Sequence, residues 1–279
     1  MCLIALSVEK TKDWNGKDSY FFIIIANRDE YHERPTTKMH WWSNNQILAG
    51  KDEEAGGTWL GTNKEGKFAA ITNLKENTNS KYLVSRGELV TGFLESDLSA
   101  KSYLEQLESN KEQYAGFNLI VGDKNGLFYL CNRLDGIFFI PEGIHALGNL
   151  TLNSSTKKIE AIKNDLHEII HEGFSKQKGF KIMKQDYGSL HEKTKKELKV
   201  RDGEEIPYRF IRSPIYGTRC TTVFSSLPSG EVNISELTYK KEGIEGSSVD
   251  FSFNIKDRLF CILYRKVINH LILACMLLF

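Results

Sequence analysis

The residue with the clearest chemical potential is Cys2, which directly follows the initiator methionine. Removal of Met1, which is usual before a small residue, would leave a thiol and a free α-amine on one residue. That pair combines a nucleophile with a base, because an α-amine with a pKa of about 8 can accept the thiol proton. A cysteine in an apolar strand can also be a small buried hydrophobe, so its position alone leaves both interpretations open.

Two opposite charges, Arg28 and Asp29, follow a second apolar segment at residues 20–26. Charges that end an apolar strand must be solvated, paired or directed at a ligand. If residues 2–8 and 20–26 form a hairpin, the end of the second segment lies beside the start of the first. We then expect Arg28 to lower the pKa of the thiol and Asp29 to hold the α-amine. A turn with a surface ion pair is the alternative.

The elements that position these residues are indicated by hydrophobic periodicity and turn residues. A polar turn with Asp13, Asn15 and Gly16 predicts the first hairpin. Helical periodicity occurs at residues 86–95, 100–108 and 157–170. Further strands are predicted at residues 46–49, 58–60, 68–72, 118–121, 127–131, 137–140, 221–224, 231–238 and 249–253. Many strands with two groups of helices predict an α+β layered fold.

A series of short motifs occurs along the chain, among them Cys2-Leu-Ile-Ala, Ala26-Asn-Arg-Asp-Glu, Ala55-Gly-Gly-Thr-Trp-Leu-Gly and Ser85-Arg-Gly-Glu-Leu-Val. Further motifs lie at residues 34–36, 40–42, 47–52, 68–73, 116–119 and 216–219. In these motifs and their order, the chain resembles the NRDE family, also called the Transport and Golgi organization protein 2 family. The resemblance covers residues 2 to about 255.

The chain also resembles, more faintly, the N-terminal nucleophile hydrolases of the choloylglycine hydrolase and penicillin acylase type. This resemblance implies an α+β fold, a four-layer αββα sandwich, with Cys2 as the nucleophile. Residues 61–73 resemble a stretch of those hydrolases that would place Asn73 near an oxyanion site. The candidate site residues are therefore Cys2, Arg28, Asp29, Asn73, Asn149 and Arg219.

Two functions follow from the resemblance, and a purely structural scaffold is a third possibility. The first is hydrolysis or transfer of a non-peptide amide or thioester acyl group through a Cys2 acyl-enzyme, which requires no cofactor. The second is binding and trafficking of haem or of acyl-CoA or lipid, linked to Golgi organisation. A scaffold would leave the charges of Arg28 and Asp29 without a role.

Several residues bear on a haem or lipid ligand. His32, His40, His145 and the cysteines are potential haem ligands, but the sequence has no Cys-x-x-Cys-His attachment motif. Histidines in loops are more often surface or structural residues. The tryptophans at positions 41, 42 and 59 can line an apolar ligand site, although packing in the core is the favoured interpretation.

Composition limits the classes of partner and the organisation of the chain. With 279 residues, 41% of them hydrophobic, and a net charge of +1, the sequence lacks the basic surface that nucleic acid demands. Five widely spaced cysteines and no secretion signal predict reduced thiols, no metal site and a cytoplasmic location, with Golgi or mitochondrial association possible in a eukaryote. Residues 1–255 are predicted as a single domain, and residues 256–279 as an apolar extension, helical or poorly ordered, that can contact a membrane. The oligomeric state is left open.

Overall fold

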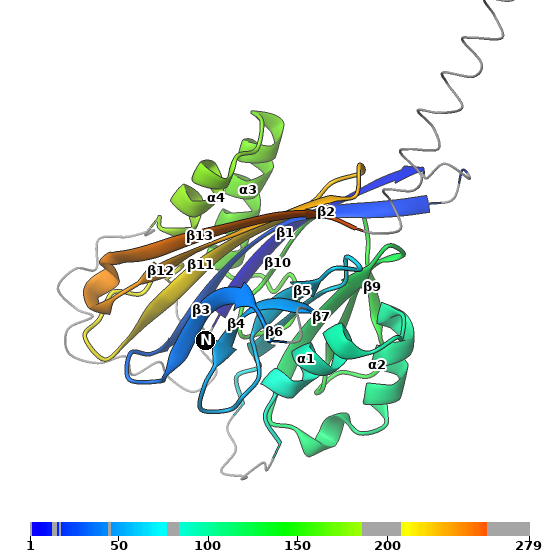
Figure 1. Ribbon diagram of the computed structural model, residues 1–279, viewed down its shortest axis with the longest axis horizontal. Helices are drawn as coiled ribbons and strands as arrows, with labels where there is room; N and C mark the ends of the chain where they lie inside the picture. The colour runs from blue at the N-terminus through cyan, green and yellow to red at the C-terminus, as the bar shows by residue number, and fades with distance from the viewer. Residues whose placement is uncertain are drawn as a thin grey trace, which may run out of the picture.

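The computed structural model describes residues 2–12, 16, 18–43, 46–76, 84–185 and 208–255, and their strands form two antiparallel sheets (Figure 1). The six-stranded sheet has the order β10-β1-β2-β11-β12-β13. Its strands are β1 (Cys2–Lys12), β2 (Asp18–Tyr31), β10 (Gly143–Leu147), β11 (Tyr216–Ser226), β12 (Glu231–Tyr239) and β13 (Glu245–Asn254). The seven-stranded sheet runs in sequence order: β3 (Thr36–Trp41), β4 (Ile47–Asp52), β5 (Leu60–Asn63), β6 (Phe68–Asn73), β7 (Phe117–Asp123), β8 (Gly126–Cys131) and β9 (Phe138–Ile140).

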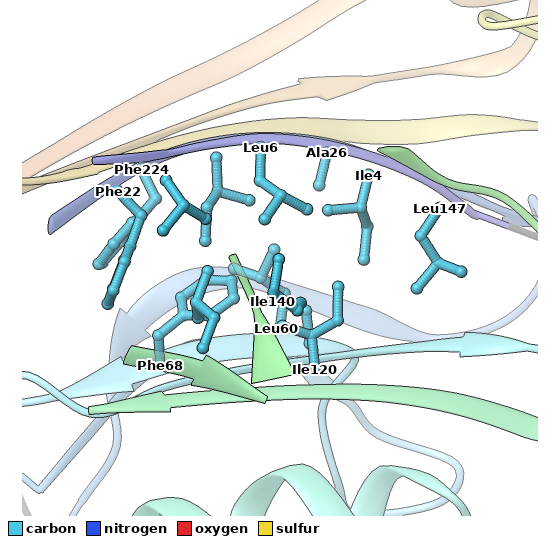
Figure 2. Packing of buried hydrophobic residues seen from close by; sticks show 14 of the residues in the cluster. Ile4, Leu6, Phe22, Ala26, Leu60, Phe68, Ile120, Ile140, Leu147 and Phe224 are labelled. Carbon is cyan, nitrogen blue, oxygen red and sulfur yellow. The ribbon is translucent and has the colours of Figure 1, made fainter. Parts of the chain in front are cut away.

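The two sheets face each other across an apolar core. In β1, Ile4 and Leu6 point toward the second sheet, where they meet side chains such as Leu60 and Ile120 (Figure 2). The alternate residues Leu3 and Ala5 are also buried, but they pack on the opposite face. Side chains alternate between the faces of a strand, so the continuous apolar run of β1 reflects burial on both faces.

Helices cover the outer face of each sheet (Figure 1). The helices α1 (Gly87–Glu95) and α2 (Ala100–Glu108) pack on the seven-stranded sheet, with Phe93 and Leu104 fully buried. The helices α3 (Lys157–His171) and α4 (Lys176–Met183) pack on the six-stranded sheet through residues such as Ile162 and Met183. Two short 3-10 turns, η1 (Lys111–Gln113) and η2 (Lys241–Gly243), complete the elements described. The predicted four-layer αββα sandwich is confirmed.

Some local predictions differ from the structure. The strands β3 and β10 and the helix α4 were not predicted, and the strand expected at residues 58–60 instead begins at Leu60 and runs to Asn63. The proposed extension at residues 256–279 lies outside the described residues, so its organisation stays a prediction. None of the helices within the described ranges has both the length and the apolar character needed to cross a membrane.

Candidate active site

Strand pairing determines the position of Cys2. The predicted hairpin is confirmed, and its register places Cys2 directly opposite Arg28. On the other side of β2, Arg28 pairs with Cys220 and Asp29 pairs with Thr218, so Arg219 is the extra residue of a bulge in β11. A bulge redirects side chains at the end of a sheet. The start of β1 and the end of β2 therefore form one charged cluster at the end of the six-stranded sheet.

A cavity of about 150 Å³ opens beside this cluster. It brings together four of the candidate residues, Cys2, Arg28, Asp29 and Asn73. Residues of the second sheet, of the 55–59 turn that joins two of its strands, and of the start of α1 supply most of the remaining lining, so the cavity lies where the two layers meet. Its other lining residues are Glu30, Arg34, Asp52, Ala55, Gly57, Thr58, Trp59, Ile71, Ser85, Arg86 and Gly87.

Arg28 is held by contacts from the second sheet. Its guanidinium donates hydrogen bonds to Asp52 Oδ2 at 2.9 Å and to Thr36 Oγ1 at 3.1 Å, and it lies 4.2 Å from the ring centre of Trp59. Only 4% of the residue is exposed. A buried arginine needs such a partner, because an unpaired buried charge costs several kcal/mol. Arg28 thus joins the two sheets as well as facing Cys2.

The Cys2 thiol is more difficult to ionise than an ordinary thiol. Burial has the largest effect and raises its pKa, and the carboxylate of Asp29 also raises it, whereas the positive charge of the N-terminus, Arg28 and the backbone N–H of Asp29 lower the pKa by smaller amounts. Arg28 lowers the pKa, as expected, but burial has the larger effect, so the net shift is upward. The thiol is therefore protonated near neutral pH and needs a base to become a nucleophile.

Asp29 is buried beside the thiol and is also perturbed. Burial raises the pKa of its carboxyl group, while the hydrogen bond from Thr218 Oγ1 to Asp29 Oδ1, at 2.6 Å, lowers it. Tyr216 donates a hydrogen bond from its hydroxyl to the backbone carbonyl of Asp29 at 2.9 Å. These contacts from β11 fix the orientation of Asp29. The expected contact of Asp29 with the α-amine stays a prediction.

The remaining candidate residues have different positions. Asn73 ends β6 and its exposed side chain lines the cavity. Asn149 is buried and does not line the cavity, but its Nδ2 donates to the backbone carbonyl of Asn73 at 2.7 Å. Arg219 also lies outside the lining, and its guanidinium donates to the backbone carbonyls of Tyr31 and Arg34. Asn149 and Arg219 therefore position the residues around the cavity.

Four charged residues of the cavity, Glu30, Arg34, Asp52 and Arg86, received no role from the sequence. Asp52 accepts hydrogen bonds from both Arg28 and Arg34, the latter at 2.7 Å. Arg86 precedes α1 and lines the cavity from the side of the helix. All four lie in motifs that resemble the family, at residues 26–30, 34–36, 47–52 and 85–90, and those motifs were the signal that could have identified them. Their side chains converge only when distant strands pair and α1 packs on the second sheet.

The three histidines considered as haem ligands are engaged elsewhere. His32, His40 and His145 each make a hydrogen bond to a backbone carbonyl, at 2.8 to 2.9 Å, and the cavity lining does not include them. Within the described ranges no group of three metal-binding side chains is present. Trp59 lines the cavity and, like Trp41, packs against the core between the two sheets. Trp42 packs against the core between the seven-stranded sheet and its helices.

Two facing sheets between helical layers, with Cys2 at a polar cavity, define a four-layer αββα protein with a cysteine-centred site. A model of the family described as Transport and Golgi organisation 2 matches residues 1–241. The chain is 31% identical to the Transport and Golgi organization protein 2 homolog of Bos taurus and 33% identical to that of Homo sapiens. Each alignment spans 242 residues, 79% of this chain and 87% of the relative. The chain belongs to the Transport and Golgi organisation 2 family, as its motifs predicted.

A search of solved structures finds a more remote similarity. The N-acylethanolamine-hydrolyzing acid amidase ortholog of Caenorhabditis elegans aligns with a TM-score of 0.44 and 10% sequence identity. The alignment covers 80% of this chain and 92% of that protein.

Proposed function

We propose that this protein hydrolyses or transfers a non-peptide amide or thioester acyl group through Cys2. The observation that carries the proposal is the convergence of Cys2, Arg28, Asp29 and Asn73 on one polar cavity. A scaffold has no need for a thiol, a buried carboxyl group and a buried guanidinium at the same opening. Polar groups that converge on a concave site, with perturbed pKa values, are typical of catalytic centres.

The reaction begins with transfer of the thiol proton to the α-amine of Cys2 after Met1 is removed. The sulfur then bonds to the acyl carbon, and negative charge develops on the carbonyl oxygen, where the amide of Asn73 can donate. The C–N or C–S bond breaks, and the leaving group takes the proton from the ammonium. Water, or another acyl acceptor, then cleaves the Cys2 thioester and restores the thiol. The high pKa of the thiol makes this base necessary.

The size of the cavity restricts the substrate. Sites that enclose a drug-sized ligand measure about 300–1,000 Å³, whereas the described residues enclose about 150 Å³. The cavity therefore suits the reacting end of a substrate, and the remainder of the molecule would lie outside it.

A panel of small thioesters and amides, assayed with Cys2→Ala, tests the proposal. We expect the wild-type chain to release the leaving group with an initial burst and the variant to show none. Cys131→Ala is the control, because Cys131 is a thiol buried in the core and does not line the cavity. Equal turnover by the wild-type and Cys2→Ala proteins would contradict a role of Cys2 as the nucleophile.

A second candidate function, carriage of acyl-CoA or another lipid, is favoured by one surface feature. Tyr31 and Ile215 are 58% and 68% exposed. They lie together, since Tyr31 pairs with Tyr216 and Ile215 accepts the N–H of His32. Glu30, which precedes Tyr31, lines the cavity. An acyl chain can rest on this apolar surface while its polar end occupies the cavity.

Calorimetric titration with a long-chain acyl-CoA and with haem distinguishes the carrier from the enzyme. Acyl-CoA should saturate the protein without being hydrolysed, and Ile215→Ser should weaken its binding, because the chain loses an apolar contact. Haem binding that is unaffected by Ile215→Ser would indicate another site. Turnover of a thioester, with no saturable binding after Cys2→Ala, would support the enzyme.

A further inference from the structure

The three arginines that line the cavity are not equally neutralised. Arg28 and Arg34 share the carboxylate of Asp52, at 2.9 and 2.7 Å, and Arg34 also pairs with Glu54 at 3.0 Å. Arg86 donates one hydrogen bond, at 3.0 Å, to the backbone carbonyl of Gly116. No ion pair joins Arg86 to a carboxylate among the residues that the structure describes. Among the three arginines, Arg86 therefore stands without a carboxylate partner in the described part of the chain, and most of its N–H donors are available to a ligand.

Nearby acidic groups do not neutralise Arg86 directly. The carboxylate of Glu76 is occupied by Arg133 at 2.8 Å and by the backbone N–H of Gly116 at 2.6 Å. Glu30 lines the cavity, and its Oε1 accepts the N–H of Tyr31 at 2.8 Å. Both carboxylates raise the pKa of Arg86, but burial has the larger effect and lowers it. A partly buried guanidinium in this setting favours an added anion.

The start of α1 places Arg86 at the cavity. It is the residue that precedes α1, and its neighbours Ser85 and Gly87 also line the cavity. A side chain added to Gly57 would lie 2.6 Å from the backbone carbon of Gly87, so the start of α1 is packed directly against the 55–59 turn. The N-terminus of a helix adds a weak attraction for negative charge. The backbone of Arg86 is thus held beside the cavity that Cys2 also lines, and the hydrogen bond to Gly116 restrains its guanidinium.

The geometry points to Arg86 as a receptor for a carboxylate on the substrate, placed within a few atoms of the carbon that Cys2 attacks. The inference rests on the proposed function, because it takes the Cys2 sulfur as the reacting atom. Arginine recognises a carboxylate through paired N–H donors, and the cavity of about 150 Å³ accommodates such a compact group. Acyl donors with a short acidic acyl part are therefore the preferred substrates.

Two alkylating agents of nearly equal size test the inference. Iodoacetate and iodoacetamide both form a carbon–sulfur bond with the Cys2 thiolate and release iodide, but only iodoacetate carries a carboxylate. Mass spectrometry measures the rate at which each reagent modifies Cys2. The ratio of the iodoacetate rate to the iodoacetamide rate is divided by the same ratio for the unfolded chain. This normalised ratio should exceed one. Arg86→Gln should reduce this normalised ratio about tenfold, the loss expected for one charged hydrogen-bonding partner.

Three controls separate the possible outcomes. Arg86→Lys keeps the positive charge, so its normalised ratio should lie between those of the wild type and Arg86→Gln. Lys101→Gln removes a positive charge from a 64% exposed side chain on α2 and should leave the normalised ratio unchanged. In the wild-type protein, succinate should protect Cys2 from iodoacetamide and succinamide should not, which requires no folded variant. If Cys2 reacts but Arg86→Gln leaves the normalised rate ratio unchanged, the inference about Arg86 is wrong. The same holds if succinate does not protect Cys2. Either result would leave the proposed function standing. A folded Cys2 that reacts with neither reagent would remove the proposed function as well.

Discussion

The reactivity of Cys2 depends on opposing effects of its surroundings on the pKa of the thiol. Its position after Met1 and opposite Arg28 follows from one hairpin. The direction of its pKa shift depends on burial, which other strands and α1 determine, and on Asp29, which Thr218 orients. No local pattern shows whether burial or Arg28 has the larger effect. The effect expected of Arg28 is therefore present, but burial reverses the net shift.

The pH dependence of Cys2 alkylation is the first prediction at this scale. Because the folded protein raises the thiol pKa, the midpoint of the rate profile should lie above that of the unfolded chain. Asp29→Asn should lower this midpoint, since the Asp29 carboxylate disfavours the thiolate. Glu30→Gln, which removes the adjacent cavity carboxylate, is the matched control and should have little effect. A folded midpoint at or below the unfolded one would contradict the burial of the thiol.

A second residue-scale prediction concerns Asp52. Asp52→Asn should reduce the free energy of unfolding by about 2–4 kcal/mol, because it leaves the buried Arg28 without a charged partner. Glu54→Gln should cost less than about 1 kcal/mol, since Glu54 is 60% exposed and contacts Arg34 at the surface. Urea unfolding measures both changes. Equal losses for the two variants would show that the Asp52 pair is not the stabilising one.

The same pair predicts a pH effect on stability. Burial raises the pKa of Asp52, but the hydrogen bond and charge of Arg34, the N–H of Ala55 and the charge of Arg28 outweigh it and lower the pKa below its ordinary 3.8. A lowered folded pKa stabilises the fold above the unfolded value, and this stability is lost as the pH falls through the folded value. The free energy of unfolding of the wild type should therefore exceed that of Asp52→Asn by a constant amount near neutral pH, and this excess should decrease below about pH 4.

At the scale of elements, periodicity identified most strands and three of the four described helices. Long apolar runs such as β1 and the regular spacing of Ile159, Ile162, Leu166 and Ile169 in α3 gave strong signals. The strand β3 was missed because Met39 is the buried residue of a polar segment and a bulge interrupts its pairing with β4. The helix α4 was missed because it is short and rich in lysine, and only Gly179, Ile182 and Met183 are buried, which is too few residues to give a clear helical period.

The contact between the 55–59 turn and α1 supplies the third prediction. Gly57→Ala should displace the start of α1, because the added carbon would lie 2.6 Å from backbone of Gly87, and such overpacking costs about 1–3 kcal/mol. Alkylation of Cys2 should change with it, since Gly87 lines the cavity. Gly56→Ala is the matched control: the site has open space and a φ of +77°, so stability falls by about 1 kcal/mol without a change at Cys2. Unchanged alkylation in Gly57→Ala would show that α1 does not shape the site.

For the whole molecule, the layers explain why the site could be predicted only in part. Cys2, Arg28 and Asp29 come from neighbouring strands of one sheet, which a hairpin reveals. Residues from the other sheet and from α1 reach the same cavity only when the two layers pack. Asp52 and Arg86 lie in motifs that marked the family, yet no local pattern shows that they face Cys2. The four-layer fold was expected from family resemblance, whereas periodicity alone indicated only α+β layers.

A chain that ends at Ile255 gives the fourth prediction. Ile255 is 8% exposed and its N–H donates to the carbonyl of Gly230, so the described core extends to this residue. The shortened protein should unfold cooperatively near the temperature of the full chain and retain Cys2 alkylation. Ile255→Ala in the shortened chain should cost about 2–4 kcal/mol, because it leaves a cavity in the core. Loss of cooperative unfolding on shortening would assign residues 256–279 to the core.

The most direct test of the central claim is the mass of the native N-terminal peptide after brief treatment of the folded protein with iodoacetamide. The account predicts that Met1 is absent and that one carbamidomethyl group is on Cys2, with the buried Cys131 and Cys220 unmodified. A retained Met1 would remove the α-amine that must accept the thiol proton. An unmodified Cys2 that reacts only after unfolding would identify a structural thiol, and either result would contradict Cys2 as the nucleophile.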